Sequence, residues 1–600
     1  MNNKIAILDF GGQYTHLIAN RIRRIGVYTE ILPNNIKSEE CKQFKGIILS
    51  GGPHSVLDKN KPEFDVNIFQ LKIPVLGLCY GHQLIAASLG GEVLRGEIRE
   101  YGIAQLKIVN HSPLFKSLCS IQQVWMSHGD TVIKLPRGFN IIGSTSNCKI
   151  AAMGNDKKKI YGLQFHPEVT DTPNGIKILE NFINLCSCSK DWNAKTFFNE
   201  IKNEVKVKCK NKKVFLLVSG GVDSTVAFTL LNRVLGKKRV LGLHIDNGLM
   251  RYKESRSILN FMKKNGYDNL HVIDASKKFL TELKEKYDPE EKRKIIGRVF
   301  IEIKEKALKK FGLKSSEWIM GQGTIYPDTI ESAGTANADL IKTHHNRVEE
   351  VKELLKRGEV IEPLAHLYKD EVRELGRILK IPDELLLRHP FPGPGLGVRL
   401  LCSNGKNSKI DFRLYKSVQA IAKKNGYEAI VLPVKSVGVA GDSRTYAHPA
   451  LIFGELDWEK LEKISTDITN KVKGINRVIY KLDNSKKEKS NYRNIKAYIT
   501  KDRLNLLRTL DKIATEALYK FNEYQNVWQM PVVLLPLVNK AGKQCAVLRP
   551  ILSQEAMTAR FARLKNETLE YIIHKAKRIK EIGDIFYDVT NKPPATIEWE

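Results

Sequence analysis

The sequence predicts an α/β protein of several domains. Short, apolar, β-rich runs such as Lys4–Phe10, Gly46–Leu49 and Val75–Leu78 alternate with amphipathic stretches, a pattern typical of a largely parallel sheet covered by helices. Two of the apolar runs end in glycine-containing turns that open helices, near residues 79 and 220. The length of 600 residues corresponds to roughly four domains of about 150 residues each.

The chain is strongly basic, with 97 Lys and Arg against 66 Asp and Glu and a formal net charge of +31. The basic residues are spread over helices and loops, as at Lys208–Lys213, and do not form one stripe with interleaved aromatic residues. We therefore expect a lysine-rich solvated surface that attracts anionic substrates, and no nucleic-acid partner.

The apolar runs are much shorter than a membrane span, and the strand-like segment Ile5–Phe10 runs into Gly11-Gly12 without a signal sequence. The nine cysteines show no paired metal-site spacing, and the closest pair, Cys186 and Cys188, is interpreted as incidental. These features predict a cytoplasmic protein with reduced thiols and no membrane partner.

A candidate nucleophile, Cys79, lies in the segment Gly77-Leu78-Cys79-Tyr80-Gly81. A strand turns sharply there into a helix that runs from Leu84 to Leu89, which is the form of a nucleophile elbow with a thiol. A thiol at a helix N-terminus is the more nucleophilic at neutral pH. Because buried free cysteines are common, Cys79 alone does not establish a catalytic site.

Two further segments supply the specificity. Gly162–Glu168 ends a strand with a histidine that can accept a thiol proton and a carboxylate that can hold the imidazole in the required tautomer. Ser50–Pro53 follows another strand and offers backbone N–H groups. The predicted catalytic residues are Cys79, His166 and Glu168, with an oxyanion hole from Gly52 and Tyr80.

The second turn predicts a phosphate-binding loop. It follows the buried strand Val214–Val218 and opens a helix that runs to Leu235, so its backbone N–H groups and the helix dipole favour an anion. No lysine follows the glycines, so this is not a Walker motif. An ordinary strand–turn–helix junction is the alternative, which the apolar context disfavours. The predicted phosphate-binding residues are Ser219, Gly220, Gly221, Val222, Asp223, Ser224 and Thr225.

These motifs resemble known families. Residues 1–189 resemble the class I glutamine amidotransferases, which release ammonia from glutamine through a thioester. The loop Ser219–Thr225 resembles that of ATP pyrophosphatases with the adenine-nucleotide alpha-hydrolase-like fold, which cleave ATP between the α and β phosphates. With Arg388–Arg399, Leu432–Arg444 and Asn591–Glu600, the whole chain resembles the long form of the glutamine-hydrolysing GMP synthetase family.

The resemblance implies a carbon–nitrogen ligase that aminates XMP to GMP through an adenyl-XMP intermediate. Its substrates would be XMP, ATP and glutamine. Mg²⁺ would accompany ATP, held mainly by phosphates, with Asp223 as a candidate ligand and no permanently bound cofactor. The resemblance also implies XMP-binding residues and a lid over ATP. The XMP-binding residues are Arg251, Asp442, Gln529, Lys592 and Glu598, and the lid residues are Lys342, His344 and His345.

The C-terminal region contains an internal repeat. Leu432–Val434 recurs as Met530–Val532, and Ile475–Tyr480 recurs as Ile582–Tyr587. If the two copies pair within one chain, we expect a monomer with an intramolecular pseudo-dimer and at most weak or ligand-promoted dimerisation. The predicted domains are 1–189 (amidotransferase), 190–399 (ATP pyrophosphatase), 400–490 (first α+β copy) and 491–600 (second α+β copy with the XMP-binding tail).

Two alternatives remain open at this point. One is another glutamine-fed ATP pyrophosphatase, of the NAD or tRNA-modifying type. The other is a basic nucleic-acid-binding or regulatory protein without enzymatic activity. XMP-dependent release of pyrophosphate separates all three.

Overall fold

The computed structural model describes residues 3–314, 316–333, 357, 359–406, 410–440, 443–483, 492–553 and 559–600. The chain divides into two compact units, the first made of residues 1–203, 325–344 and 365–371 and the second of the remainder. This division is coarser than the four predicted domains. It also assigns two short segments of the predicted 190–399 domain to the first unit, where the Tyr326 hydroxyl accepts a hydrogen bond from Ile31 N at 2.9 Å.

The first unit is built on a nine-stranded sheet of order β2-β1-β3-β4-β9-β8-β7-β5-β6. The strands from β2 to β9 in this order are parallel, whereas β8, β7, β5 and β6 join antiparallel. The expected parallel arrangement therefore holds for one half of the sheet, the half that carries the strand-to-helix turns. The strands are β1 (Lys4–Asp9), β2 (Tyr28–Pro33), β3 (Gly46–Leu49), β4 (Val75–Leu78), β5 (Glu92–Ile108), β6 (Ile121–Lys134), β7 (Asn140–Ser144), β8 (Ala152–Asn155) and β9 (Ile160–Leu163).

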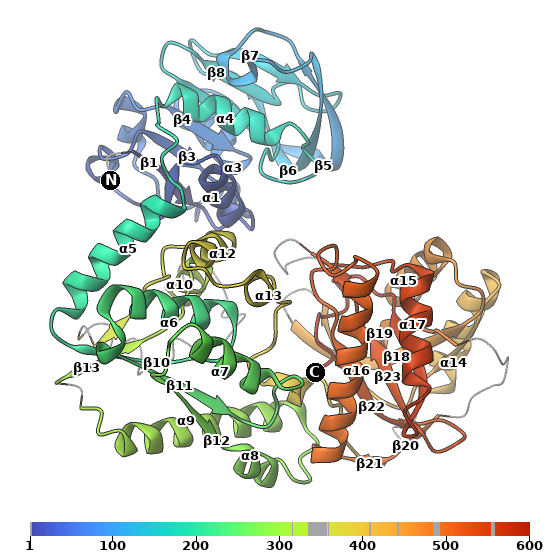
Figure 1. Ribbon diagram of the computed structural model, residues 1–600. Coiled ribbons are helices and arrows are strands. Elements are labelled where there is room, and N and C mark those ends of the chain that lie inside the picture. Colours follow the sequence, from blue (N-terminus) through green and yellow to red (C-terminus); the bar gives the residue numbers. More distant parts are fainter. Residues whose placement is uncertain are drawn as a thin grey trace. The chain divides into compact units, whose positions relative to one another are not determined.

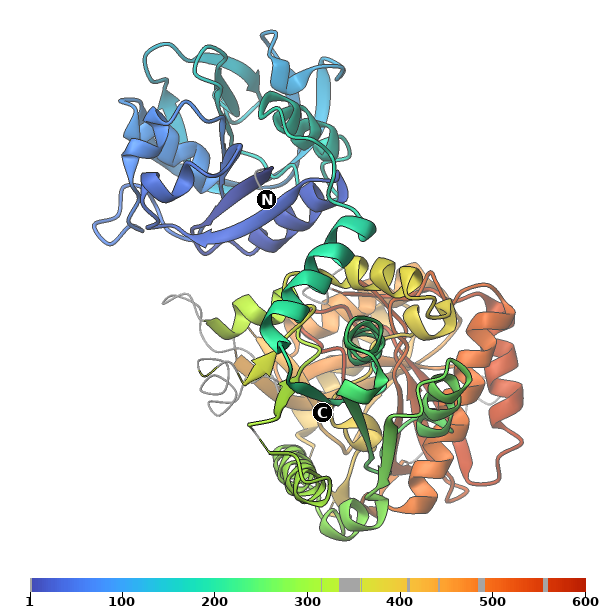
Figure 2. The ribbon, with the colours of Figure 1, turned by 60° about the vertical axis from the view of Figure 1, so that its left-hand side comes forward.

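Helices cover both faces of this sheet (Figures 1 and 2). Ile5 and Ile7 of β1 pack in one core with α1 and α4, while Ala6 and Leu8 pack in a second core with α3. The alternation follows from the two-residue period of a strand. The helices are α1 (Thr15–Arg24), α2 (Ser38–Cys41), η1 (Val66–Gln70), α3 (Tyr80–Ser88), η2 (Pro113–Phe115), α4 (Gly175–Leu185) and α10 (Tyr326–Ala333); α5 (Ala194–Cys209) and α12 (Lys369–Ile378) each run from one unit into the other.

The second unit begins with a parallel five-stranded sheet of order β12-β11-β10-β13-β14. A Cβ on Gly242 of β11 would contact Phe228 of α6, whereas its neighbour Leu243 packs in the core that includes Ile296 of α9, so the two helices lie on opposite faces (Figures 1 and 2). The elements are β10 (Lys213–Leu217), α6 (Val222–Leu235), η3 (Lys237–Arg239), β11 (Val240–Asp246), α7 (Glu254–Lys264), β12 (Leu270–Asp274), α8 (Ser276–Glu282), α9 (Pro289–Lys310), β13 (Trp318–Gly321), β14 (Val360–Ile361), α13 (Asp383–Leu386) and η4 (Gly395–Val398).

The C-terminal part of this unit forms one mixed sheet with main order β16-β18-β19-β26-β23-β22-β20. Its helices lie along one face, because alternate strand residues such as Ala450 and Ile452 pack with them in a single core. The elements are β15 (Ser403–Asn404), α14 (Phe412–Lys424), β16 (Glu428–Val431), β17 (Ser436–Ala440), β18 (Ser443–Phe453), α15 (Trp458–Lys471), β19 (Ile475–Lys481), β20 (Arg493–Asn494), β21 (Lys496–Ala497), α16 (Lys501–Lys520), β22 (Val532–Val538), β23 (Gln544–Leu548), β24 (Ile551–Leu552), β25 (Arg560–Phe561), α17 (Asn566–Ala576) and β26 (Ile582–Asp588).

The order of this sheet is symmetric about its centre. On one side β16, β18 and β19 follow one another, and on the other β22, β23 and β26 do so, with β19 and β26 antiparallel in the middle. Tyr480 and Tyr587, which occupy the same position in the two sequence copies, face each other directly in that central pair. A pseudo-two-fold axis therefore passes between these two residues, as two copies joined edge to edge require.

Candidate active sites

Cys79 occupies a strained turn between β4 and α3. Its backbone has φ of +51° and ψ of −103°, which is rare for a residue with a side chain and is typical of a nucleophile elbow. The glycines on either side permit the turn: a Cβ on Gly77 would lie 2.4 Å from Gly81 O, and one on Gly81 would lie 2.4 Å from Leu49 O. The sequence therefore sets both the bend and the position of the thiol.

His166 and Glu168 form a buried pair, with His166 Nδ1 2.7 Å from Glu168 Oε1. Burial lowers the pKa of His166, but the Glu168 carboxylate and the hydrogen bond to Cys79 outweigh it and raise that pKa to about 10. The imidazole is therefore held beside the thiol in a form that can carry a proton. Tyr14 packs edge-on against the His166 ring at 5.0 Å.

The segment predicted to hold an oxyanion lies against the same site. A Cβ on Gly51 would be 3.6 Å from Cys79 Cβ and 3.4 Å from His166 Cε1, and Gly81 N donates to Ser50 O at 3.2 Å. Gly52 has no room for a side chain, because a Cβ there would lie 2.5 Å from Phe10 O. The use of Gly52 and Tyr80 as oxyanion donors stays a prediction.

Two buried glutamines that the sequence reasoning did not assign lie behind the thiol. Gln164 Nε2 is 3.7 Å from Cys79 Sγ, and Gln83 Nε2 donates to Gln164 Oε1 at 3.2 Å and to Asp130 O at 2.9 Å. Because Gln164 Oε1 accepts from Gln83, its amide nitrogen must face the sulfur. Gln164 lies within the quoted segment Gly162–Glu168, but only its contacts in the fold indicate a role.

The predicted phosphate loop lies between β10 and α6, at the carboxyl end of the parallel sheet. Gly220 has φ of +90°, and a Cβ there would lie 2.2 Å from Ile258 Cδ1, so the turn requires glycine. Ser219 Oγ accepts from Gly221 N at 3.3 Å and lies 3.1 Å from Ser224 Oγ. Ser224 and Thr225 are buried, and the Ser224 hydroxyl donates to Gly221 O at 3.1 Å, so this hydroxyl braces the loop.

Arg251 and Gln529, two of the predicted XMP-binding residues, line one cavity of about 180 Å³ in the second unit. The Arg251 guanidinium donates to His389 O and Pro390 O and lies 4.3 Å from the centre of the Phe391 ring. The proline- and glycine-rich loop therefore holds Arg251 in place, as expected of a rigid segment.

Glu598 joins this cluster through two contacts. Its Oε1 accepts from Gln529 Nε2 at 3.2 Å, and its carboxylate is paired in two places with the buried Arg399, at 3.0 and 3.2 Å. Arg399 was not predicted as a functional residue. The backbone N–H of Lys592 donates to Ala559 O at 2.7 Å, and its side chain does not line the cavity. Asp442, Lys342, His344 and His345 lie outside the described residues.

The tail that carries Lys592 and Glu598 is docked. Trp599 is fully buried, and the Glu600 carboxylate pairs with Lys292 of α9, whose side chain is also fully buried. Among the described residues, no cluster of three or more His, Cys, Asp or Glu side chains can hold a metal ion. Within the same residues, no helix has the length and apolar character needed to cross a membrane.

Three family models match the chain. The model for class I glutamine amidotransferases matches residues 6–186, the NAD synthase model matches 194–349, and the GMP synthase C-terminal domain model matches 416–490 and 516–599. The chain thus combines an amidotransferase with an ATP-using synthetase, and the expected fold class is confirmed.

Relatives of known function cover the whole chain. The probable GMP synthase (glutamine-hydrolyzing) of Leptospira interrogans serovar copenhageni is 46% identical over 609 residues, covering 100% of both chains. The GMP synthase (glutamine-hydrolyzing) of Caldanaerobacter subterraneus subsp. tengcongensis is 46% identical over 500 residues, covering 79% of this chain and 96% of its own. This chain belongs to the glutamine-hydrolysing GMP synthase family, which removes the NAD and tRNA-modifying alternatives.

A solved structure also resembles the first region. It is a GMP synthase subunit from Thermoplasma acidophilum that is 34% identical, covering 31% of this chain and 94% of its own, with a TM-score of 0.29.

Proposed function

We propose that this chain is a GMP synthase that aminates XMP with ammonia released from glutamine, at the expense of ATP. The observation that carries the proposal is the buried Cys79, His166 and Glu168 arrangement in a chain that also bears a phosphate loop and matches GMP synthases along its full length. The other products are glutamate, AMP and pyrophosphate.

Glutamine hydrolysis takes place at the elbow. The Cys79 thiolate attacks the side-chain amide carbon of glutamine, and the backbone N–H groups of Gly52 and Tyr80 stabilise the oxyanion. His166, oriented by Glu168, gives a proton to the departing ammonia, and a thioester to Cys79 remains. Water activated by His166 then hydrolyses the thioester, which releases glutamate and restores the thiol.

The synthetase step takes place in the second unit. The loop Ser219–Thr225 holds the β and γ phosphates of ATP, and the C2 oxygen of XMP attacks the α phosphorus, so that pyrophosphate leaves. Ammonia then adds to C2 of the adenyl-XMP intermediate and AMP leaves. Mg²⁺ fits here as a phosphate-bound ion with Asp223 as the candidate protein ligand, and it would neutralise phosphate charge.

XMP is held by Arg251, Asp442, Gln529, Lys592 and Glu598 in this proposal. The proximity of Arg251, Gln529 and Glu598 supports it, and the cationic side chains suit a 5′-phosphate. Lys342, His344 and His345 are proposed to close over ATP. The free state of all nine cysteines agrees with a cytoplasmic location. No nucleic-acid or membrane partner is proposed.

The test uses XMP-dependent release of pyrophosphate, with glutamine or an ammonium salt as the nitrogen source. The wild-type chain should release pyrophosphate and form GMP with either source. Cys79→Ala should lose glutamine-dependent GMP formation but keep ammonium-dependent formation, because the thiol serves only the supply of ammonia.

A matched control is Cys119→Ala, which alters an exposed cysteine of the same unit and should leave both activities unchanged. Failure of ammonium to support a folded Cys79→Ala variant would contradict the division of labour between two sites. Release of pyrophosphate without XMP would contradict the assigned substrate.

A further inference from the structure

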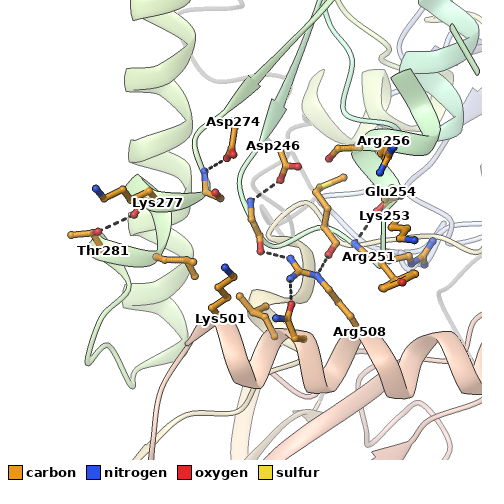
Figure 3. Close-up of a pocket in the computed structure, with 18 of the residues that line it drawn as sticks. Asp246, Arg251, Lys253, Glu254, Arg256, Asp274, Lys277, Thr281, Lys501 and Arg508 are labelled. Carbon is orange, nitrogen blue, oxygen red and sulfur yellow. Dashed lines mark hydrogen bonds between the residues drawn. The ribbon is translucent and has the colours of Figure 1, made fainter. Parts of the chain in front are cut away.

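A second and larger cavity, of about 880 Å³, lies in the second unit beside the loop that follows β11 (Figure 3). Its walls come from this loop, from α8 with the residues after it, and from α16. No residue of the phosphate loop Ser219–Thr225 lines it, and of the proposed XMP-binding residues only Arg251 does. The volume falls in the range of about 300–1,000 Å³ that is usual for small-molecule sites.

The walls carry an excess of cations that have no carboxylate partner. Five of them take part in none of the ion pairs among the described residues: Lys253, Arg256, Lys277, Lys284 and Lys501. They come from three separate elements and face one cavity, which is an arrangement suited to an anion with several charges.

The three carboxylates of the cavity are already engaged with backbone N–H groups. Asp246 accepts from Gly248 N at 2.9 Å, Asp274 from Ser276 N at 2.9 Å, and Glu254 from Arg251 N at 3.1 Å. The hydrogen bonds from Ser276 lower the pKa of Asp274. These carboxylates therefore shape the loops and leave the lysine side chains for a ligand.

Arg508 of α16 forms a fixed part of the same wall. Its guanidinium donates to Gly248 O at 2.6 Å and to Met250 O at 2.9 Å, which ties α16 to the loop that carries Arg251 (Figure 3). An occupant of the cavity therefore touches the loop whose next residue, Arg251, reaches the smaller cavity.

Apolar side chains also line the cavity. Met250, Leu280 and Leu504 do so, and Tyr252 lies beside them with its ring exposed. An inorganic anion would leave this surface unused, whereas a nucleoside would cover it. The ligand indicated is a nucleotide, with its phosphates on the lysines and its base on the apolar wall.

We propose that this cavity is a nucleotide-binding effector site, separate from the phosphate loop, and that its occupant changes the affinity for XMP through the loop carrying Arg251. The proposal does not depend on the chemistry of either active site. Its ligand is a nucleoside polyphosphate bound by Lys277 and Lys501 from opposite walls.

The test is calorimetric titration of the full chain with GTP, in the presence of saturating XMP and α,β-methylene-ATP. The latter occupies the ATP site and cannot be cleaved between the α and β phosphates. The wild-type chain should bind about one further equivalent of GTP, and the Lys277→Gln/Lys501→Gln variant should bind it at least about tenfold more weakly. The control, Lys310→Gln/Lys580→Gln, removes two exposed lysines outside the cavity and the same net charge, and should match the wild type.

Inorganic tripolyphosphate is titrated in parallel. Weaker binding of tripolyphosphate than of GTP at the same site supports a nucleotide, and equal binding overturns the role of the apolar wall. Absence of a saturable GTP site, or an equal loss in both double variants, overturns the proposal. GMP formation without GTP should be the same in all variants; its loss in Lys277→Gln/Lys501→Gln alone would place the cavity within the substrate site and overturn a separate one.

A second readout addresses the coupling. Added GTP should change the KM for XMP in the wild-type chain and in the control variant, and should leave it unchanged in Lys277→Gln/Lys501→Gln. A KM for XMP that does not respond to bound GTP would overturn the effector role.

Discussion

Gln164 directs its side-chain amide nitrogen at Cys79 Sγ, at 3.7 Å, and Gln83 holds the other end of the same amide. Both glutamines are buried, and neither carries a charge. An N–H donor aimed at the sulfur favours the thiolate over the thiol, because a hydrogen bond to the charged form stabilises that form. Gln164 thus acts as a positioning residue behind the nucleophile.

We expect Gln164→Glu to lower glutamine-dependent GMP formation by roughly 100-fold, because an acceptor oxygen replaces the donor next to the sulfur. Ammonium-dependent formation should stay unchanged. Alkylation of Cys79 by iodoacetamide should become slower and move to higher pH, a change that a merely structural defect would not produce. Gln123→Glu, on the exposed side of the same unit, serves as the control. An unchanged pH profile of alkylation would contradict this role.

The His166–Glu168 pair predicts a dependence on pH. The pKa of His166 is raised from 6.5 to about 10 in the folded state, so the pair stabilises the fold fully below about pH 6.5. This contribution is lost as the pH rises through about 10. Glu168→Gln removes the carboxylate that raises the pKa and leaves the burial that lowers it.

We therefore expect the alkaline limb of glutamine-dependent activity in Glu168→Gln to shift to lower pH by at least about one unit. The measurement is GMP formation between about pH 6 and 10, with ammonium-dependent activity as the internal control. If the two enzymes show the same alkaline limb, Glu168 does not set the protonation of His166.

Asp223 lies in the first turn of α6, directly after the phosphate loop. We expect Asp223→Ala to reduce pyrophosphate release by about 100-fold or more with either nitrogen source, because both routes share the adenylation step. Asp268→Ala, in the connection before β12, should have no such effect. Normal activity of Asp223→Ala with ammonium would remove this loop from the ATP site.

The central β19–β26 pair predicts the state of assembly. Its strand edges are joined within one chain, so the edge that a single copy would offer to a second protomer is already covered. Sedimentation at micromolar concentration should give a monomer near 68.1 kDa without XMP, with at most weak dimerisation when XMP is present. A tight dimer in both conditions would show that the paired copies form a different interface.

Local sequence determined much of the site. Gly77, Cys79 and Gly81 predict the elbow because only glycine permits so close an approach of the backbone, and the structure shows that a Cβ at either glycine would clash. The same reasoning holds for Gly220 in the phosphate loop. Apolar runs of period two predicted β1, β4, β10 and β11 near their observed bounds, since burial on both faces of a sheet requires such runs.

The tertiary structure decided what joins distant segments. The antiparallel half of the first sheet, the pairing of Glu598 with Arg399, and the contact of Gln164 with Cys79 bring together residues that no local pattern relates. The same is true of Tyr480 facing Tyr587 and of the lysines around the large cavity. The physical reason is that backbone turns and strand periods depend on neighbours in sequence, whereas side-chain pairs depend on which faces the packed core brings together.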